Sequence, residues 1–248
     1  MVVERLHIEE PEPPAPVTEP EKTFEEVLDE HPVSIQVNGQ WQTFPNAKAA
    51  EEASYEEYKA NLRRNAKNFR ITDEHLGEGG PKAKFQANIE GIKLLKYLEE
   101  TTAQATPEQQ EVLSRYVGWG GLSDAFDLEK PAWALEYAQL KELLTPEEYA
   151  AARSSTLNAH YTSPTVIQAI YEAVDRMGFE TGNILEPSMG VGNFFGMLPE
   201  KMRNSRLYGV ELDSISGRIA KQLYPKADIT VAGFETTDRR DFYDLAIG

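Results

Sequence analysis

The spacing of apolar positions changes character once along the chain. In the first part, apolar side chains recur at three- and four-residue intervals over 46–69 and 83–100, which predicts two helices. Two more helices are predicted to begin after Thr106 and Thr145, because each threonine is followed by Pro, Glu and then Gln or Glu. This is the pattern of a capping box with proline in the first turn. We therefore expect residues 31–156 to form a mostly helical region.

A short segment ahead of these helices alternates between apolar and polar residues. Residues 33–44 predict a β-hairpin that turns at the Asn-Gly pair 38–39. A two-residue loop would place Trp41 opposite Gln36. A three-residue loop with a bulge would place Trp41 opposite Val37 and gather the apolar side chains on one face. We expect the second arrangement.

The pattern from 157 to 248 is different. Short apolar runs, which predict strands, alternate with segments of helical spacing. The expected helices cover 164–177 and 214–223, and the expected strands cover 183–186, 207–212, 228–232 and 243–247. Such alternation predicts an α/β fold with a parallel sheet.

Composition and charge narrow the possible functions. The chain has 248 residues, 40% of them hydrophobic, no cysteine and a formal net charge of -16. The lack of cysteine excludes disulfides, thiolate catalysis and Cys-ligated zinc, and the four histidines show no metal-ligand spacing. Residues 1–30 are rich in Pro and Glu, which predicts a flexible tail or linker. Without a signal peptide or a spanning apolar run, we expect a cytoplasmic protein with neither membrane nor metal partners.

One group of basic residues stands out against the acidic background. It lies along the predicted helix 46–69 and just after it. Its members are Lys59, Arg63, Arg64, Lys67 and Arg70. The group is a candidate contact for a phosphate backbone. The alternative is an ordinary solvated helix face, which is the commoner outcome for such a run.

The strongest chemical signal lies between the first and second strands of the 157–248 region. The first strand ends in Glu186, and the chain then turns through Gly190-Val191-Gly192 into a helix. Glycines allow the backbone to approach a ligand at the carboxyl end of a parallel sheet. Glu211 ends the next strand at the distance where an acid binds ribose hydroxyls. This ordered set predicts a nucleotide site.

Two residues discriminate between nucleotides. Phe195 stands where a dinucleotide-binding turn has its third glycine, and Gly196 comes one residue late. The Glu186 carboxylate would repel a pyrophosphate but suits a cationic amino-acid tail. S-adenosylmethionine has such a tail and no phosphate, so the charges favour this cofactor over NAD.

The segment 158–248 resembles the cofactor-binding half of N6-adenine DNA methyltransferases. His160-Tyr161-Thr162-Ser163-Pro164 matches the segment that opens their domain, and Glu186-Pro187 through Phe194 matches their glycine-rich motif. The resemblance implies a partial Rossmann-like methyltransferase core that binds S-adenosylmethionine. The residues it assigns to the cofactor, with the neighbours we add, are Tyr161, Thr162, Pro164, Glu186, Pro187, Gly190, Gly192, Asn193, Phe194, Glu211, Leu212, Phe234 and Glu235. Glu235 matches least well, because Phe234 stands where an acid often falls.

Residues 60–248 also resemble large mobile-element proteins that couple such a methylase to a helicase-like region. The family's catalytic Asn/Asp-Pro-Pro-aromatic motif would begin after Gly248, so we expect no catalytic residue in this chain. We expect it to be part of a longer protein that acts on DNA. By itself it should hold the cofactor without transferring a methyl group.

Several alternatives remain open at the sequence level. One alternative is a non-catalytic module that positions DNA or a partner, and another is a full-length protein that methylates RNA or protein. An NAD-dependent oxidoreductase is disfavoured by Glu186 and Phe195. The loop Gly118–Gly121 lacks the Gly-Lys-Ser/Thr ending of a phosphate-binding loop. We expect that loop to turn the chain tightly and to pack Trp119 in the core. Asp213 either assists Glu211 or starts the following helix.

Overall fold

The computed structural model describes residues 31–73, 75–157 and 161–248. The flexible tail predicted for 1–30 and His160 of the matched segment 160–164 therefore lie outside the described residues. Packing divides the chain into two compact units that meet between Asn61 and Leu62.

The first unit holds a β-hairpin and most of one helix. Strands β1 (Val33–Val37) and β2 (Gln40–Phe44) pair antiparallel, and α2 (Ala47–Asn65) follows them. The Asn46 side chain accepts a hydrogen bond from the Ala49 amide at 2.9 Å, which satisfies one of the free amides in the first turn of α2.

The predicted bulge in this hairpin is wrong. The register places Trp41 opposite Gln36 and Val37 opposite Gln40, so the loop has two residues. Asn38 and Gly39 both have positive φ, 52° and 75°, as the preferred two-residue hairpin turn requires. The local backbone preference of Asn-Gly therefore decides the register, and Trp41 stays 72% exposed instead of joining an apolar face.

Helix α2 ends earlier than the sequence predicts. It stops at Asn65, and the chain continues in an extended path through Phe69, whose amide donates to the Leu223 carbonyl oxygen at 2.8 Å. Phe69 is buried, whereas Tyr55 and Tyr58 of the predicted apolar stripe are exposed. A tertiary contact with a distant helix thus replaces the last helical turn.

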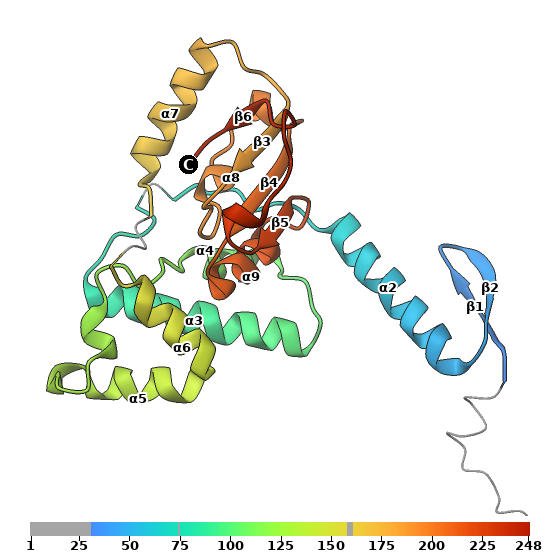
Figure 1. Ribbon diagram of the computed structural model, residues 1–248, viewed down its shortest axis with the longest axis horizontal. Coiled ribbons are helices and arrows are strands. Elements are labelled where there is room, and N and C mark those ends of the chain that lie inside the picture. Colours follow the sequence, from blue (N-terminus) through green and yellow to red (C-terminus); the bar gives the residue numbers. More distant parts are fainter. Residues whose placement is uncertain (1–30, 74, 158–160) are drawn as a thin grey trace, which may run out of the picture. The chain divides into compact units, whose positions relative to one another are not determined.

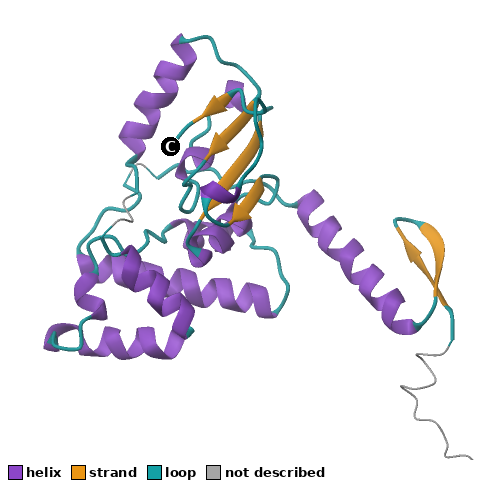
Figure 2. Cartoon of the chain, viewed as in Figure 1, coloured by secondary structure: helices purple, strands orange, loops and turns teal. Residues whose placement is uncertain are grey.

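The second unit combines helices with a parallel sheet (Figures 1 and 2). Its α-helices are α3 (Pro81–Glu100), α4 (Pro107–Ser114), α5 (Ala134–Leu143), α6 (Pro146–Ser155), α7 (Pro164–Arg176), α8 (Asn193–Gly196) and α9 (Ser214–Leu223). Its short 3-10 helices are η1 (Ser123–Phe126), η2 (Pro131–Trp133), η3 (Glu200–Met202) and η4 (Phe234–Thr236). Its strands are β3 (Asn183–Glu186), β4 (Arg206–Glu211), β5 (Asp228–Val231) and β6 (Leu245–Ala246).

The sheet confirms the α/β prediction. Within the described residues it has four strands in the order β5-β4-β3-β6, all parallel, and Figure 2 shows their arrows pointing the same way. Ile184, Leu207 and Ile229 point from adjacent strands into the main hydrophobic core. Helix α9 covers this face, so the core side of the sheet is closed by the helix that starts just after Glu211.

The helical region shares that core with the sheet. Helices α3 and α4 contact α9, and in Figure 1 α9 lies between α3 and the strands. Ile89 and Leu113 belong to the same cluster of buried residues as Ile219 and Leu223. The helices that follow α2 and the sheet therefore pack into one compact unit.

Both predicted capping boxes are confirmed. Thr106 accepts from the Gln109 amide, Thr145 accepts from the Glu148 amide, and each third residue bonds back to the threonine amide. Trp119 is buried in contact with Phe85 and Phe126, as expected for the Gly118–Gly121 loop.

Candidate functional site

The turn after β3 adopts a shape that requires glycine at two positions. Gly190 and Gly192 have φ of +56° and +84°, where a side chain would be strained. A Cβ at Gly190 would lie 2.7 Å from the Tyr161 ring, and one at Gly192 would lie 2.6 Å from the Tyr224 ring. The Met189 amide donates to the Val210 carbonyl oxygen at 3.0 Å, which fixes the turn to β4. The backbone of this turn is therefore close-packed on two aromatic rings.

Glu211 connects this turn to the beginning of α9. Its Oε2 accepts from the Gly190 amide at 2.6 Å, and its Oε1 accepts from the Asp213 amide at 2.7 Å. Burial raises the pKa of Glu211, and the amides of Asp213 and Gly190 offset part of this rise. Each carboxylate oxygen can accept a second hydrogen bond, so the group can also receive donors from a ligand at the sheet edge.

Glu186 lies on the same face of the sheet, beneath the turn. It pairs with Gly209 in register, and Glu211 lies two residues further along β4, so the two side chains share a face. Glu186 is only 3% exposed, and its Oε2 has no hydrogen-bond partner among the described residues. Burial and the nearby Glu211 raise the pKa of Glu186 well above its usual range, against an opposing effect of the Phe194 amide. Among the residues that the structure describes, no cation pairs with this buried carboxyl group.

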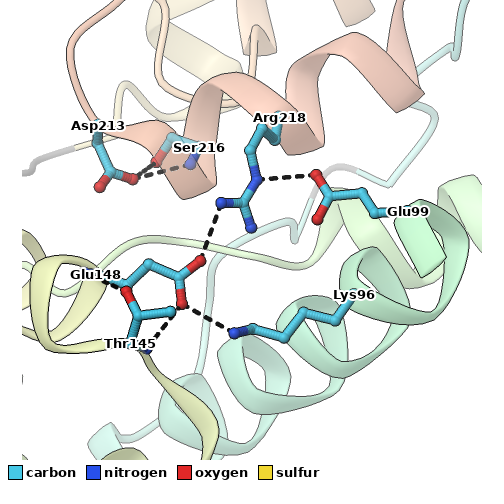
Figure 3. A network of polar contacts seen from close by, with 7 residues as sticks. All are labelled: Lys96, Glu99, Thr145, Glu148, Asp213, Ser216 and Arg218. Carbon is cyan, nitrogen blue, oxygen red and sulfur yellow. Dashed lines mark hydrogen bonds and ion pairs between the residues drawn. The ribbon is translucent and has the colours of Figure 1, made fainter.

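Asp213 caps the start of α9, which is one of the two roles predicted for it. Its Oδ2 accepts from the Ser216 amide at 2.8 Å and from the Ser216 hydroxyl at 2.6 Å, as Figure 3 shows. The Ser216 oxygen also lies 3.3 Å from the Tyr161 hydroxyl. Because Glu211 accepts from the Asp213 amide, one chain of contacts joins Tyr161 to Glu211.

Of the residues that open the segment 158–248, Tyr161 lies beside the same turn. The Tyr161 ring covers Gly190, and burial raises the pKa of Tyr161, an effect that Ser216 opposes and that Glu211 and Asp213 reinforce. Thr162 is half-buried, and Pro164 is the first residue of α7. Of the three, Tyr161 is thus the residue placed directly against the glycine-rich turn.

The two phenylalanines after the turn belong to the core. Phe194 packs on Tyr171 and Phe195 on Tyr224, both edge to face, and both phenylalanines are buried. The Tyr171 hydroxyl donates to the Phe194 carbonyl oxygen at 2.8 Å. Asn193 begins α8 and is half-buried, and Pro187 is half-buried at the end of β3. The Phe194 ring therefore helps to hold α8 on the core.

Exposed apolar side chains lie at the ends of the next two strands. Leu212, which follows Glu211, is 76% exposed, and Phe234, which follows β5, is 50% exposed. Glu235 is also exposed, and its carboxylate folds back onto Gly233. Both side chains follow the carboxyl ends of neighbouring parallel strands, which is the edge where open α/β sheets bind ligands.

The basic residues do not form the single helical row that the sequence suggests. Lys67 and Arg70 lie beyond the end of α2, and the Arg70 guanidinium donates to the Leu198 carbonyl oxygen. Burial lowers the pKa of Arg70. Lys59 belongs to the first unit, where it pairs with Glu56, and the Arg63 side chain lies outside the described residues. Arg64 and Lys67 are exposed.

A surface hollow lies on the opposite face of the sheet from the carboxylates. It is lined by residues of β4, β5 and the segment before β6, including Tyr208, Thr230, Arg239 and Tyr243. Because Tyr208 and Thr230 alternate with Gly209 and Ile229, they face away from α9. This hollow is therefore separate from the turn at Gly190.

Sequence reasoning missed residues that support the site from outside its motifs. Ser216 links Tyr161 to Asp213, and Gly118 lies against Tyr161. The signal for Ser216 was its place in the first turn of the helix after Glu211, and no pattern signalled the Gly118 contact. Within the described residues, no group of three or more acidic, histidine or cysteine side chains is placed to hold a metal ion. The described helices also include none with the length and apolar character to cross a bilayer.

Comparison with known proteins finds two distant similarities. The chain is 25% identical over 175 residues to the "Defense against restriction protein B" of Escherichia phage P1, a match that covers 69% of this chain and 6% of that protein. It is 41% identical over 70 residues to the "Type II methyltransferase M.CvrRI" of Paramecium bursaria Chlorella virus XZ-6E, covering 28% of this chain and 18% of that enzyme.

Both matches are partial, and no protein-family profile or solved structure matches the chain. The chain spans well under two thirds of the length of both relatives. Over part of its length, the chain is methyltransferase-like.

Proposed function

We propose that this chain binds S-adenosylmethionine and forms the cofactor-binding part of a DNA adenine-N6 methyltransferase with a Rossmann-like core. The observation that carries the proposal is the placement of Glu211. Its carboxylate ends β4 and accepts from the Gly190 amide of the turn after β3, at the edge where parallel α/β sheets bind ligands.

The ribose and the adenine of the cofactor fit the ends of β4 and β5. Glu211 has acceptor capacity left for the two ribose hydroxyls. Leu212 and Phe234 offer exposed apolar surface beside it, which suits the two faces of an adenine ring. Glu235 would accept from the adenine amine after moving from its contact with Gly233.

The amino-acid tail of the cofactor fits the charge at the turn. Glu186 is buried near Glu211 and lacks a cationic partner among the described residues. A ligand with an ammonium and a sulfonium group would supply the missing positive charge, whereas a pyrophosphate would add repulsion. Tyr161, with Thr162 and Pro164 behind it, would close the tail on the side of Gly190.

S-adenosylmethionine supplies an activated methyl group when bound. The residues described here would orient it, and the acceptor base would be flipped out of the DNA helix to reach it. The assignment of DNA and of adenine rests on the resemblance of 158–248, and the match to a type II methyltransferase supports methyl transfer. Arg64 and Lys67 are the exposed candidates for phosphate contacts, and a helicase-like region in the same polypeptide rests on the resemblance alone.

Calorimetric titration of the purified chain tests the cofactor. We expect one site for S-adenosylmethionine and none for NAD. Glu211→Gln should weaken the binding by about 100-fold, or about 2.7 kcal/mol, because an amide cannot accept from both Gly190 and Asp213. Glu180→Gln, an exposed glutamate before β3, is the matched control and should bind like the wild type.

The outcome also separates the alternatives. Binding of NAD in preference to S-adenosylmethionine would replace the proposal with an oxidoreductase. Equal affinity in Glu211→Gln and the wild type would remove the site from this sheet edge. For the full-length protein, mass spectrometry of DNA and RNA substrates would identify the methylated base.

A further inference from the structure

Tyr161 is held between two glycines from different parts of the unit. A Cβ on Gly190 would lie 2.7 Å from its Cε1, and a Cβ on Gly118 would lie 2.7 Å from its Cε2. The two glycines thus meet opposite edges of one ring. Gly190 belongs to the turn of the proposed cofactor site, whereas Gly118 belongs to the loop between α4 and η1 in the helical region.

The loop that carries Gly118 is fixed in place by a buried side chain. Asn88 of α3 accepts from the Val117 amide at 2.9 Å and donates to the Gly118 carbonyl oxygen at 2.5 Å. Asn88 is completely buried, and Trp119 packs against Phe85 one helical turn earlier on α3. The position of Gly118 is therefore set by α3 and not by the loop's own flexibility.

The polar atoms of the loop face the same cluster as Tyr161. The Tyr116 hydroxyl and the Trp119 Nε1 are buried without a hydrogen-bond partner among the described residues. Burial raises the pKa of Tyr116 well above its usual range, and nearby Asp213 and Tyr161 add to the rise, whereas Ser216 and Trp119 oppose it. Tyr116 thus lies beside the residues that join Tyr161 to Glu211.

Ion pairs hold the helical region to α9 close to this cluster. Arg218 of α9 pairs with Glu99 of α3 at 2.9 Å and with Glu148 of α6 at 2.9 Å, as Figure 3 shows. Glu148 also pairs with Lys96 of α3 at 2.9 Å. These contacts join α3 and α6 to α9, the helix that begins next to Glu211. Helix α3 therefore contacts both the Gly118 loop and the helix at the sheet edge.

We propose that the loop segment Tyr116–Trp119 is a positioning element of the cofactor site, in which Gly118 sets the Tyr161 ring against the turn at Gly190. This role rests on the proposed function, because it makes the helical region shape the place where the amino-acid tail of S-adenosylmethionine would bind. Gly118 acts through Tyr161 and makes no contact with the cofactor itself. A side chain at 118 would press the ring towards the Gly190 backbone, where there is no room for it, so the ring would have to leave this position and its hydroxyl would leave Ser216.

The loop offers a matched control for the test. Gly118 and Gly121 have nearly equal φ, +67° and +72°, so alanine costs similar backbone strain at both. A Cβ at Gly121 would meet nothing within 4 Å. Gly118→Ala should therefore weaken S-adenosylmethionine binding by about tenfold more than Gly121→Ala does. Both variants should bind adenosine, which lacks the tail, equally well.

Amide hydrogen exchange gives a second measurement that needs no ligand. In the free protein, the Gly190 and Asp213 amides donate to Glu211 and should exchange faster in Gly118→Ala than in Gly121→Ala. If the wild type binds no S-adenosylmethionine, the proposed function fails, while the exchange rates still decide the positioning role. Equal exchange and equal affinity in the two alanine variants would overturn the inference.

A second variant covers the case in which Gly118→Ala does not fold. Tyr161→Ala removes the ring that a side chain at 118 would meet. The double variant Gly118→Ala/Tyr161→Ala should lose no more free energy of unfolding than the sum of the losses measured for Tyr161→Ala and for Gly121→Ala. A folded Tyr161→Ala and an unfolded double variant would show that residue 118 acts through other contacts, which would also overturn the inference.

Discussion

Two buried glutamates in the same unit have opposite surroundings. Glu148, between α3, α6 and α9, is 7% exposed and pairs with Lys96 and Arg218. Glu186, beneath the glycine-rich turn, is 3% exposed, and its Oε2 has no partner in the described part of the chain. The pKa of Glu148 is lowered, because its ion pairs and the Thr145 amide outweigh burial, whereas the pKa of Glu186 is raised by burial and by Glu211.

The difference shows that burial alone does not identify a functional carboxylate. At Glu148 every interaction is satisfied within the protein, so the group stabilises the fold and offers nothing to a ligand. At Glu186 the second glutamate nearby and the missing cation leave a site that becomes more favourable when a positive ligand binds. A carboxylate that folding leaves unpaired is the better indicator of function.

The largest expected effect comes from removing the satisfied carboxylate. Glu148→Ala leaves Lys96 and Arg218 without their shared partner and breaks the capping box of α6. Because both cations are partly exposed, we expect a loss of about 2–3 kcal/mol in the free energy of unfolding, measured by chemical denaturation. Glu147→Ala, an exposed neighbour on the same helix, should change it by less than about 0.5 kcal/mol. Similar losses in the two variants would show that the ion pairs do not stabilise the fold.

This pair also shows what a sequence can predict. The capping boxes at Thr106 and Thr145 were predictable because both partners lie within three residues. The ion pairs of Glu148 were not, since Lys96 and Arg218 are 52 and 70 residues away and no period connects them. The contact between Gly118 and Tyr161 is hidden for the same reason, although the glycine-rich turn itself could be located from its motif.

At the hairpin and at the end of α2, the predictions made from the hydrophobic pattern were wrong. At the hairpin, the local preference of Asn38-Gly39 for positive φ was the better guide, and the expected gathering of apolar side chains around Trp41 was wrong. At the end of α2, helical spacing continued past Asn65, but Phe69 instead pairs its amide with Leu223. Periodicity finds an element, and neighbours that are distant in sequence decide where it ends.

A smaller effect with the opposite sign is expected at the unsatisfied carboxylate. Glu186→Gln keeps the shape of the side chain and removes the cost of burying a carboxyl group that is ionised in the unfolded chain at neutral pH. At neutral pH we expect its melting temperature to lie a few degrees above that of the wild type, while its affinity for S-adenosylmethionine falls. Calorimetry of unfolding and of binding would measure both. A variant that is less stable at neutral pH, or that binds the cofactor as tightly as the wild type, would contradict the charge argument.

The smallest effect, and the sharpest comparison, is the dependence on pH. The lowered pKa of Glu148 means that its stabilisation is present above the pKa of the unfolded chain and is lost as pH falls through the folded value. The pKa of Glu186 is raised on folding. Its contribution to the free energy of unfolding is therefore most favourable below the pKa of the unfolded chain and is lost as pH rises through the pKa of the folded protein. Measured from about pH 3 to about pH 8, the stability difference between wild type and Glu148→Gln should grow in favour of the wild type. The difference from Glu186→Gln should grow in favour of the variant. If both stability differences changed with pH in the same direction, burial, and not the neighbouring charges, would govern the pKa of both glutamates.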